Sequence, residues 1–263
     1  MSEYPHFFEV NKINKDQDTI SASSGDGVVE NCVDYDKNTE WESVGSDDTT
    51  TETITNQFKD ADGGNENRDI DRCIITGCNA KLFRIYTAYW NGAAYDAWVL
   101  QDTVTDSVRE SYILSFTSVS AGQVKIEMDT TIVADEQKTI SAFIMTVLIW
   151  EATMPMDIFS IKNKQKTSNR RLYNGTGQRI VQYDKWASAI EFRQISKTEL
   201  NSLKDIYDNY NSFIVIVEPY DYLDAYDKPE DYYRVLWMSP WQQKYFTKIK
   251  SAGYNIKIQL EEV

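Results

Sequence analysis

The stretch Asp69–Tyr86, read DIDRCIITGCNAKLFRIY, decides the fold that we expect for this chain. Two short apolar runs, Cys73–Ile75 and Leu82–Tyr86, flank a polar turn that contains Gly77 and Asn79. Short runs of β-branched and aromatic residues bounded by Gly and Asn are typical of paired strands. Neither run is long enough for a helix, and no spacing of three or four residues links their apolar positions. The stretch therefore predicts two paired β-strands.

Strand signals continue on both sides of this stretch. Asn91-Gly92 is a hairpin turn signal between two aromatic runs. Val28–Val33 reads as an early strand, Gln123–Met128 alternates like a half-buried strand, and Thr139–Trp150 reads as a closing strand buried on both faces. Short strands with turn signals about every 8–12 residues predict an antiparallel β-sandwich for the first half of the chain.

Four motifs within residues 28–150, in this order, resemble the discoidin family, also called the coagulation-factor C-type domain. They are Asp34-x-x-x-x-Thr39-x-Trp41, Ile70–Ile75, Asn79–Ile85 and Ile140–Ile144. The resemblance implies a jelly-roll β-sandwich. Cysteine-poor versions of this module occur in tail proteins of bacterial viruses and in sugar-binding modules. The disulfide-bearing extracellular members have a terminal cysteine pair that this sequence lacks, which weakens any transfer of their lipid or cell-surface binding.

Charge divides the chain into two halves. The formal net charge is −14, and residues 1–152 hold 27 acidic and 11 basic residues, whereas residues 153–263 hold 14 and 16. The first half therefore carries −16 and the second +2, which favours two domains, 1–152 and 153–263, joined near Met154-Pro155-Met156. An acidic half disfavours nucleic acid as a partner, because phosphates are bound by Lys and Arg.

Several other classes of function are also disfavoured. No apolar run approaches the roughly 20 residues of a membrane-spanning helix, so we expect no membrane insertion. The N-terminus lacks the pattern of a signal peptide. The three cysteines form no disulfide framework, and Cys73 and Cys78 have only His6 as an imidazole partner, so we expect no metal or other cofactor.

The second half predicts an α+β module in the order β-β-α-β-β-β. Two strands around a turn at Asp184-Lys185 precede a helix that begins after Ser196, and Glu199 completes a capping box. Further strands are expected at Phe213–Val217, Tyr232–Met238, Phe246–Lys250 and Tyr254–Leu260. This order, with the late strand Tyr233-Arg234-Val235-Leu236-Trp237, resembles hub and tube modules of tailed-bacteriophage tail and baseplate proteins.

A basic segment precedes this module. Residues 161–179 contain no acid and six bases, which we take as candidate subunit contacts: Lys162, Lys164, Lys166, Arg170, Arg171 and Arg179. One interpretation is a solvated arm, and the other is an arm that docks on an acidic neighbour, such as the −16 half of another copy. Assembly into a ring is expected from this charge pairing and from pairing of the strand Tyr254–Leu260 with a neighbouring copy.

Aromatic residues near turns are candidates for binding sugar rings. We name Trp90, beside the Asn91-Gly92 turn, together with Tyr89 and Tyr95, whereas Trp41 and Trp98 are expected in the core. With one histidine in the chain and no phosphate-binding loop, we expect no enzyme. The spacing of acids and Asn in residues 34–40 excludes an EF-hand but leaves a looser calcium loop or a solvated turn as alternatives.

Taken together, these features predict a structural protein of a bacteriophage tail tip or baseplate. The second half would assemble with copies of itself and with other tail proteins, and the first half would decorate the outside. It would be made in the host cytoplasm and carried in the virion. The alternative is a non-catalytic carbohydrate-binding module, free or on such a tail, that binds a host surface glycan.

Overall fold

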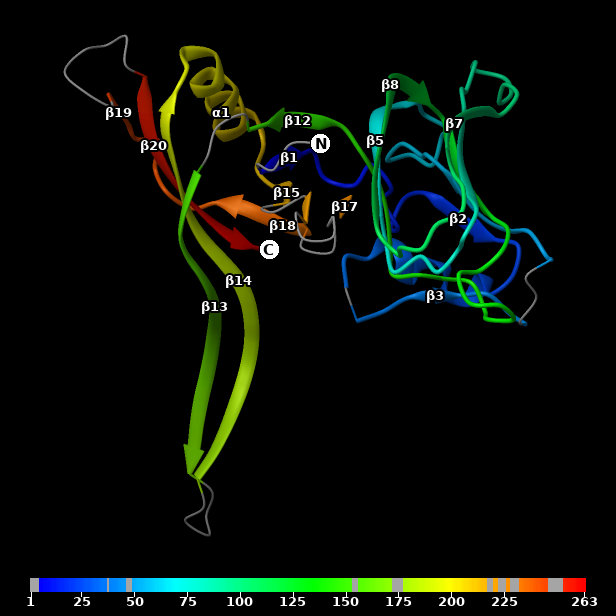
Figure 1. The fold of residues 1–263 in the computed structure, drawn as a ribbon, viewed down its shortest axis with the longest axis horizontal. Helices are drawn as coiled ribbons and strands as arrows, with labels where there is room; N and C mark the ends of the chain where they lie inside the picture. Colours follow the sequence, from blue (N-terminus) through cyan, green and yellow to red (C-terminus); the bar gives the residue numbers. More distant parts are fainter. Residues whose placement is uncertain are drawn as a thin grey trace. The chain divides into compact units, whose positions relative to one another are not determined.

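The computed structural model describes residues 5–36, 38–45, 49–152, 156–171, 177–216, 220–221, 226–227, 232–245 and 253–263. The chain forms two compact units (Figure 1). The first contains Glu9–Leu148 and Glu218–Asp231, and the second contains Ser2–Phe8, Ile149–Val217 and Tyr232–Val263. The expected fold class is confirmed, because the chain is mainly β, with an antiparallel sandwich in the first unit and an α+β arrangement in the second.

Two antiparallel sheets build the sandwich of the first unit. The larger has the strand order β2 (Thr19–Ala22), β4 (Glu52–Gln57), β9 (Gln123–Met128), β6 (Phe83–Ala88) and β7 (Val99–Val104). The smaller has the order β11 (Ala142–Thr146), β5 (Arg68–Thr76) and β8 (Tyr112–Ala121). The remaining elements of the unit are β3 (Trp41–Glu42) paired with β10 (Thr139–Ile140), β16 (Tyr220–Asp221) paired with β17 (Tyr226–Asp227), and the 3₁₀ helix η1 (Asp26–Val33).

The core of the sandwich is aromatic and aliphatic. Trp41, Phe58, Phe83, Phe143 and Met145 have no solvent-exposed surface. The strands supply these residues by alternation, so that one face of each strand is buried and the other meets water. The expected core position of Trp41 is confirmed.

The turn in the stretch Asp69–Tyr86 carries the chain between the two sheets. β5 pairs with β8 and β11, whereas β6 pairs with β7 and β9, so the predicted pairing of these two strands with each other is wrong. Gly77 starts the crossing with φ +60°, and a Cβ there would lie 2.1 Å from Ser141 Oγ. Asn79 holds the crossing in place, because its side chain donates to the Gln137 carbonyl and accepts from the Thr139 N–H. Each strand thus contributes one wall of the core.

Two further expectations for the first half are corrected. Val28–Val33 forms most of η1 instead of a strand. Thr139–Trp150 is three strands: β10 and β11 belong to the first unit, and β12 (Leu148–Glu151) joins the sheet of the second. The segment Thr139–Trp150 is largely apolar because each of its three strands buries residues in a different sheet, and not because it forms one long strand.

The sheet of the second unit has the strand order β12, β1 (His6–Phe8), β15 (Phe213–Ile216), β18 (Tyr232–Trp237), β20 (Tyr254–Glu262), β14 (Gly177–Ile195) and β13 (Met156–Arg171). A short strand, β19 (Gln243–Tyr245), also pairs with β20. The sandwich is therefore inserted in the chain between two neighbouring strands of this sheet, β1 and β12. The predicted domain 1–152 assigned residues 5–8 to the first half, whereas β1 belongs to the sheet of the second unit. That 1–152 and 153–263 are stable fragments stays a prediction.

Helix α1 (Lys197–Asn209) covers the core of the second unit. The predicted capping box is confirmed, because Ser196 Oγ accepts the Glu199 N–H and the Glu199 carboxylate accepts the Ser196 N–H. Leu200, Leu203 and Ile206 are buried along one face of the helix. β20 buries alternate side chains, as expected, but it pairs with β14 on one side and with β18 and β19 on the other. Its predicted pairing with a neighbouring copy is therefore wrong, since its backbone is already paired.

The basic segment is part of a long hairpin. β13 and β14 pair from Met156 opposite Phe192 to Arg171 opposite Gly177, so the two strands predicted around Asp184-Lys185 are one strand. β14 also pairs with β20, but only over Ala187–Ile195. The rest of the hairpin extends beyond the sheet as a two-stranded ribbon (Figure 1).

In the described part of the chain, neither helix has the length and apolar character that crossing a lipid bilayer requires. The predicted strand at Phe246–Lys250 and residues 153–155 of the expected linker lie outside the described residues.

Candidate functional site

The candidate site lies at one loop end of the sandwich and begins with the connection between β6 and β7. The predicted hairpin turn is present, with Gly92 at φ +95° and the Asn91 N–H donating to the Ala94 carbonyl at 3.1 Å. The Asp96 N–H donates to the Tyr89 carbonyl at 2.8 Å. These bonds make the aromatic loop, which we define as residues 89–96, an ordered extension of the sheet.

Two of the three sequence-predicted aromatics, Trp90 and Tyr95, come together in this loop. Trp90 and Tyr95 form an isolated β-bridge, and their ring centroids lie 4.9 Å apart with the planes tilted by 54°. Both side chains are half-buried, whereas Tyr89 is 47% exposed. Partial burial raises the pKa of the Tyr95 hydroxyl, and the Gln123 side chain acts in the opposite direction. Tyr95 is therefore an uncharged phenol at neutral pH, able to donate or accept a hydrogen bond.

Asn67 holds Trp90 by its backbone. The Trp90 N–H donates to Asn67 Oδ1 at 2.8 Å, and Asn67 Nδ2 donates to the Trp90 carbonyl at 2.8 Å. Gly122 supports the other side, since a Cβ there would lie 2.7 Å from the Trp90 Cβ and 2.9 Å from Asn67 Oδ1. Only a residue without a side chain fits so close to Trp90. The backbone and Cβ of Trp90 are thus held in a fixed position relative to the segment around Asn67.

The neighbours of Asn67 line a polar pocket of about 630 Å³. Ten residues surround it, and all belong to the first unit: Glu9, Asn11, Lys12, Asn14, Gln17, Glu66, Arg68, Asp69, Ser118 and Val147. Nine of the ten have polar or charged side chains, so the pocket offers both donors and acceptors. We call it the Arg68 pocket.

A buried carboxylate fixes the wall of the Arg68 pocket. The Asp18 side chain has no exposed surface, and Oδ2 accepts hydrogen bonds from Arg68 Nη1 at 3.0 Å and from the Asn14 N–H at 2.9 Å. Asp18 Oδ1 accepts the Lys59 N–H at 3.0 Å. Arg68 Nε also pairs with Glu66 at 2.5 Å, and its guanidinium lies 5.0 Å from the Phe58 ring centroid. The guanidinium is thereby held in place before any ligand arrives.

Sequence reasoning missed Asn67 and Arg68, and it was wrong about Trp98. Both were missed because their partners, Trp90 and Asp18, come from distant parts of the chain. Trp98 is 37% exposed and not a core residue. Its place just outside β7, an edge strand, leaves the ring on the surface. The aromatic content of the turn was the one available signal.

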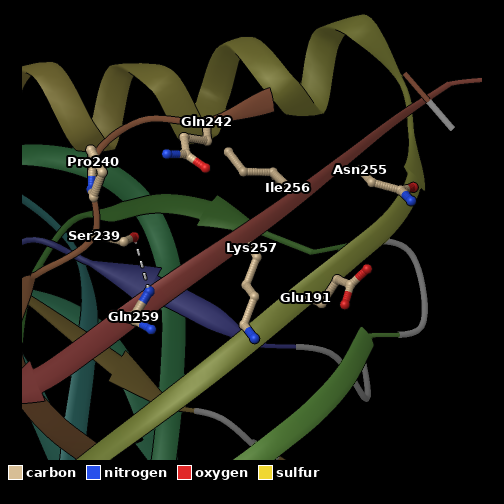
Figure 2. Close-up of a pocket in the computed structure, with 8 residues that line it drawn as sticks. All are labelled: Glu191, Ser239, Pro240, Gln242, Asn255, Ile256, Lys257 and Gln259. Atoms are coloured by element: carbon tan, nitrogen blue, oxygen red, sulfur yellow. Dashed lines mark hydrogen bonds between the residues drawn. The ribbon is translucent and has the colours of Figure 1, made fainter. Parts of the chain in front are cut away.

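A second pocket, of about 400 Å³, lies in the second unit (Figure 2). Side chains from β14, from β20 and from residues 239–242 line it, and Ser239 Oγ accepts the Gln259 N–H at 3.2 Å. Glu191 and Lys257, which are cross-strand partners, lie on its wall. None of the eight lining residues is aromatic. Among the described residues, its lining therefore offers no aromatic ring for stacking a planar or cyclic ligand.

The remaining candidates lie elsewhere. His6 is buried in β1 of the second unit, with Nε2 3.6 Å from Glu151 Oε1. In the acidic turn, Asp34 Oδ1 accepts the Asp36 N–H, and Asp36 has a lowered pKa because it accepts N–H groups of Asn38. Within the described ranges, no three side chains of His, Cys, Asp or Glu come together as a metal site would need.

The six predicted subunit-contact bases all fall on the hairpin of β13 and β14. Four of them, Lys162, Lys164, Lys166 and Arg170, occupy alternate positions of β13, and the register places Lys185 opposite Lys164. Arg171 lies opposite Gly177, and Arg179 lies opposite Asn169. Because alternate positions share a face of a strand, one face of the hairpin carries most of the basic positions.

Comparison with known proteins gives structural likeness alone. No family model matches the chain, and no curated protein does. A chitosan-binding module from Paenibacillus sp. IK-5 is similar, with 16% identity over 52% of this chain and 98% of that chain and a TM-score of 0.44. The module CBM32-5 from Clostridium perfringens, solved with GalNAc-β-1,3-galactose, is also similar. Its identity is 16% over 49% of this chain and 95% of that chain, and the TM-score is 0.38. A Ruminococcus gnavus GH29 fucosidase is matched over 26% of its chain, at 16% identity and a TM-score of 0.42. Each likeness covers about half of this chain.

Proposed function

We propose that the first unit is a non-catalytic carbohydrate-binding module whose site is the aromatic loop together with the Arg68 pocket. One observation carries the proposal. The segment 66–68 holds the backbone of Trp90 through Asn67 and lines a polar pocket through Glu66 and Arg68. Binding sites commonly combine apolar and aromatic surface with a few fixed polar groups. A sugar presents such a pair of surfaces, because its ring has apolar C–H faces and its edge carries hydroxyls.

The polar groups of the pocket suit hydroxyls. Asn14, Gln17 and Ser118 can each donate and accept. Arg68 shapes the wall beside them, because its guanidinium donates to Glu66, Asp18 and the carbonyls of Lys12 and Lys59. The paired charges of Arg68 and Asp18 require no charged ligand for neutralisation. Carbohydrate is also the ligand named for two of the similar solved structures, but likenesses of this size concern fold, so the proposal rests on the residues above.

Catalysis is not part of the proposal. The one histidine belongs to the sheet of the second unit, and two of the three acids that line the pocket, Glu9 and Glu66, are in ion pairs with Lys12 and Arg68. Hydrolysis of any polysaccharide by the purified protein would overturn this part of the proposal.

The test is a glycan array followed by calorimetry on the best ligand. Trp90→Ala should weaken binding by about 1–2 kcal/mol, roughly 5- to 30-fold, because one aromatic contact is lost. Val108→Ala is the control, since Val108 is 80% exposed in the same unit and lines neither surface. An array without any signal, or a Trp90→Ala variant that binds like the parent, would remove the proposal.

A second function, a structural component of a bacteriophage tail that assembles in a ring, is favoured by the hairpin. A two-stranded ribbon is marginally stable alone, so a hairpin that extends beyond its sheet favours a partner surface. The basic positions on one face suit an acidic surface, such as the −16 half of another copy. Such a protein would be made in the host cytoplasm and carried in the virion.

Light scattering of the full chain across concentration and salt tests this second proposal. Assembly should weaken at 1 M salt, where the Debye length is about 3 Å, and in a variant that combines Lys162→Gln, Lys164→Gln and Lys166→Gln. A chain that stays monomeric at every concentration, with and without other tail proteins, would refute the ring.

A further inference from the structure

Beyond the aromatic loop, the outer face of the larger sheet carries a second aromatic cluster. Lys125 Nζ lies 4.6 Å from the Tyr86 ring centroid and 4.9 Å from the Trp98 ring centroid. The same ammonium pairs with Glu127 at 2.5 Å. A cation that contacts two rings and a carboxylate fixes the position of both rings. We call Tyr86, Trp98 and Lys125 the sheet platform.

The sheet platform presents apolar surface to water. Trp98 is 37% exposed and Leu100 is 50% exposed, and the register places Leu100 opposite Tyr86. Partial burial, followed by the hydrogen bond to Glu127, raises the pKa of the Tyr86 hydroxyl, so the ring stays uncharged at neutral pH. An exposed indole whose orientation is already fixed loses little conformational freedom when a ligand stacks on it.

The charges around the platform are neutralised within the chain. Lys125 pairs with Glu127, and Arg84 pairs with Asp129 at 2.7 Å. That hydrogen bond also raises the pKa of Arg84, so the guanidinium remains a cation. The four side chains sum to no net charge, and a charged ligand would gain little there. A neutral ligand rich in hydroxyls fits best, because paired ions still donate and accept hydrogen bonds to hydroxyls.

β9 connects the platform to the aromatic loop. Gln123, near the Tyr95 hydroxyl, starts the strand, and Lys125 and Glu127 follow at alternate positions on its outer face. Asp129 comes directly after the strand and pairs with Arg84. At about 3.3 Å per residue, positions 123 to 129 span roughly 20 Å, which is longer than one sugar ring.

We propose that the glycan site continues along β9 onto the sheet platform and takes a neutral, linear oligosaccharide of several sugar units. The inference rests on the proposed function, since it assumes that the first unit binds carbohydrate. Trp98 stacks on one sugar ring of the oligosaccharide, and Trp90 contacts a different sugar ring. Affinity therefore grows with the length of the oligosaccharide, and the growth depends on Trp98.

The experiment measures affinity by calorimetry for a series from monosaccharide to hexasaccharide of the glycan that binds best. For the parent protein, affinity should rise at least 10-fold along the series. Trp98→Ala should lose about 5- to 30-fold for the longest member and less than 2-fold for the monosaccharide. Trp98→Tyr should restore most of the loss, and Val99→Ala, at a 57% exposed neighbour outside the platform, should bind like the parent. Circular dichroism confirms that each variant is folded.

Three outcomes separate the two proposals. If affinity does not depend on length, or if Trp98→Ala binds every member like the parent while Trp90→Ala does not, the platform is refuted and the loop site stands. If the longest members bind only when they are charged, the neutral class is wrong. If no member binds the parent protein, both proposals fail together, because the array ligand itself is then unconfirmed.

Discussion

Removing the Asn67 side chain should release Trp90 and destabilise the first unit. Asn67→Ala deletes two hydrogen bonds of 2.8 Å, one from the Trp90 N–H to Asn67 Oδ1 and one from Asn67 Nδ2 to the Trp90 carbonyl. A net contribution of about 0.5–1.5 kcal/mol for each gives a loss of about 1–3 kcal/mol in the free energy of unfolding. Because Trp90 is half-buried, solvating its freed backbone groups requires the loop to open.

The assay is urea unfolding followed by tryptophan fluorescence, with thermal unfolding as a second probe. A loss of this size corresponds to a decrease in Tm of roughly 3–10 °C for a domain of this length. Val108→Ala, at an 80% exposed position, should stay within about 0.5 kcal/mol of the parent. Glycan affinity should fall in parallel in Asn67→Ala, since the backbone of Trp90 is then no longer held. A variant with parental stability and parental affinity would show that Asn67 does not position Trp90.

Three further predictions concern stability. Asp18→Ala should cost about 3–5 kcal/mol in urea unfolding, because it leaves the partly buried Arg68 without its buried partner, and Asp18→Asn should cost less; a loss under 1 kcal/mol would contradict the role of Asp18. Ser196→Ala should cost about 1 kcal/mol in the second unit through loss of the cap, and equal stability by thermal unfolding would refute it. Burial raises the pKa of Cys32 and of Cys78 from 9.0 to about 12, so the unfolded chain releases their protons first as pH rises. Stability should therefore decrease between pH 9 and pH 12, and a flat unfolding midpoint over that range would contradict it.

Local signals in the sequence predicted local structure well. Ser196 and Glu199 predicted the start of α1, because a capping box depends on residues three apart in the chain. The alternation in Tyr254–Leu260 predicted the buried face of β20 for the same reason. The Asn91-Gly92 turn likewise predicted the hairpin between β6 and β7.

Pairing between distant segments could not be read in the same way. Nothing in Cys73–Ile75 or Leu82–Tyr86 says that the strands belong to different sheets, since both sheets bury one face in the same core. The position of Trp98 depends on β7 being an edge strand, which is a property of the whole sheet. The Arg68 pocket was missed because Asp18 and Arg68 meet only after folding.

The insertion of the sandwich between β1 and β12 has a consequence for synthesis. β1 pairs with β15. During synthesis, the ribosome makes the whole of Glu9–Leu148 and then the hairpin after Phe8, before it reaches Phe213 at the start of β15. At about 5–20 residues per second, this interval lasts on the order of tens of seconds. The sandwich has all of its larger sheet before β15 leaves the ribosome, whereas β1 has only its other neighbour, β12, to pair with until then. Phe7 and Phe8, fully buried in the finished protein, lack the strand that completes their sheet during that interval, so a chaperone would have time to compete for this segment.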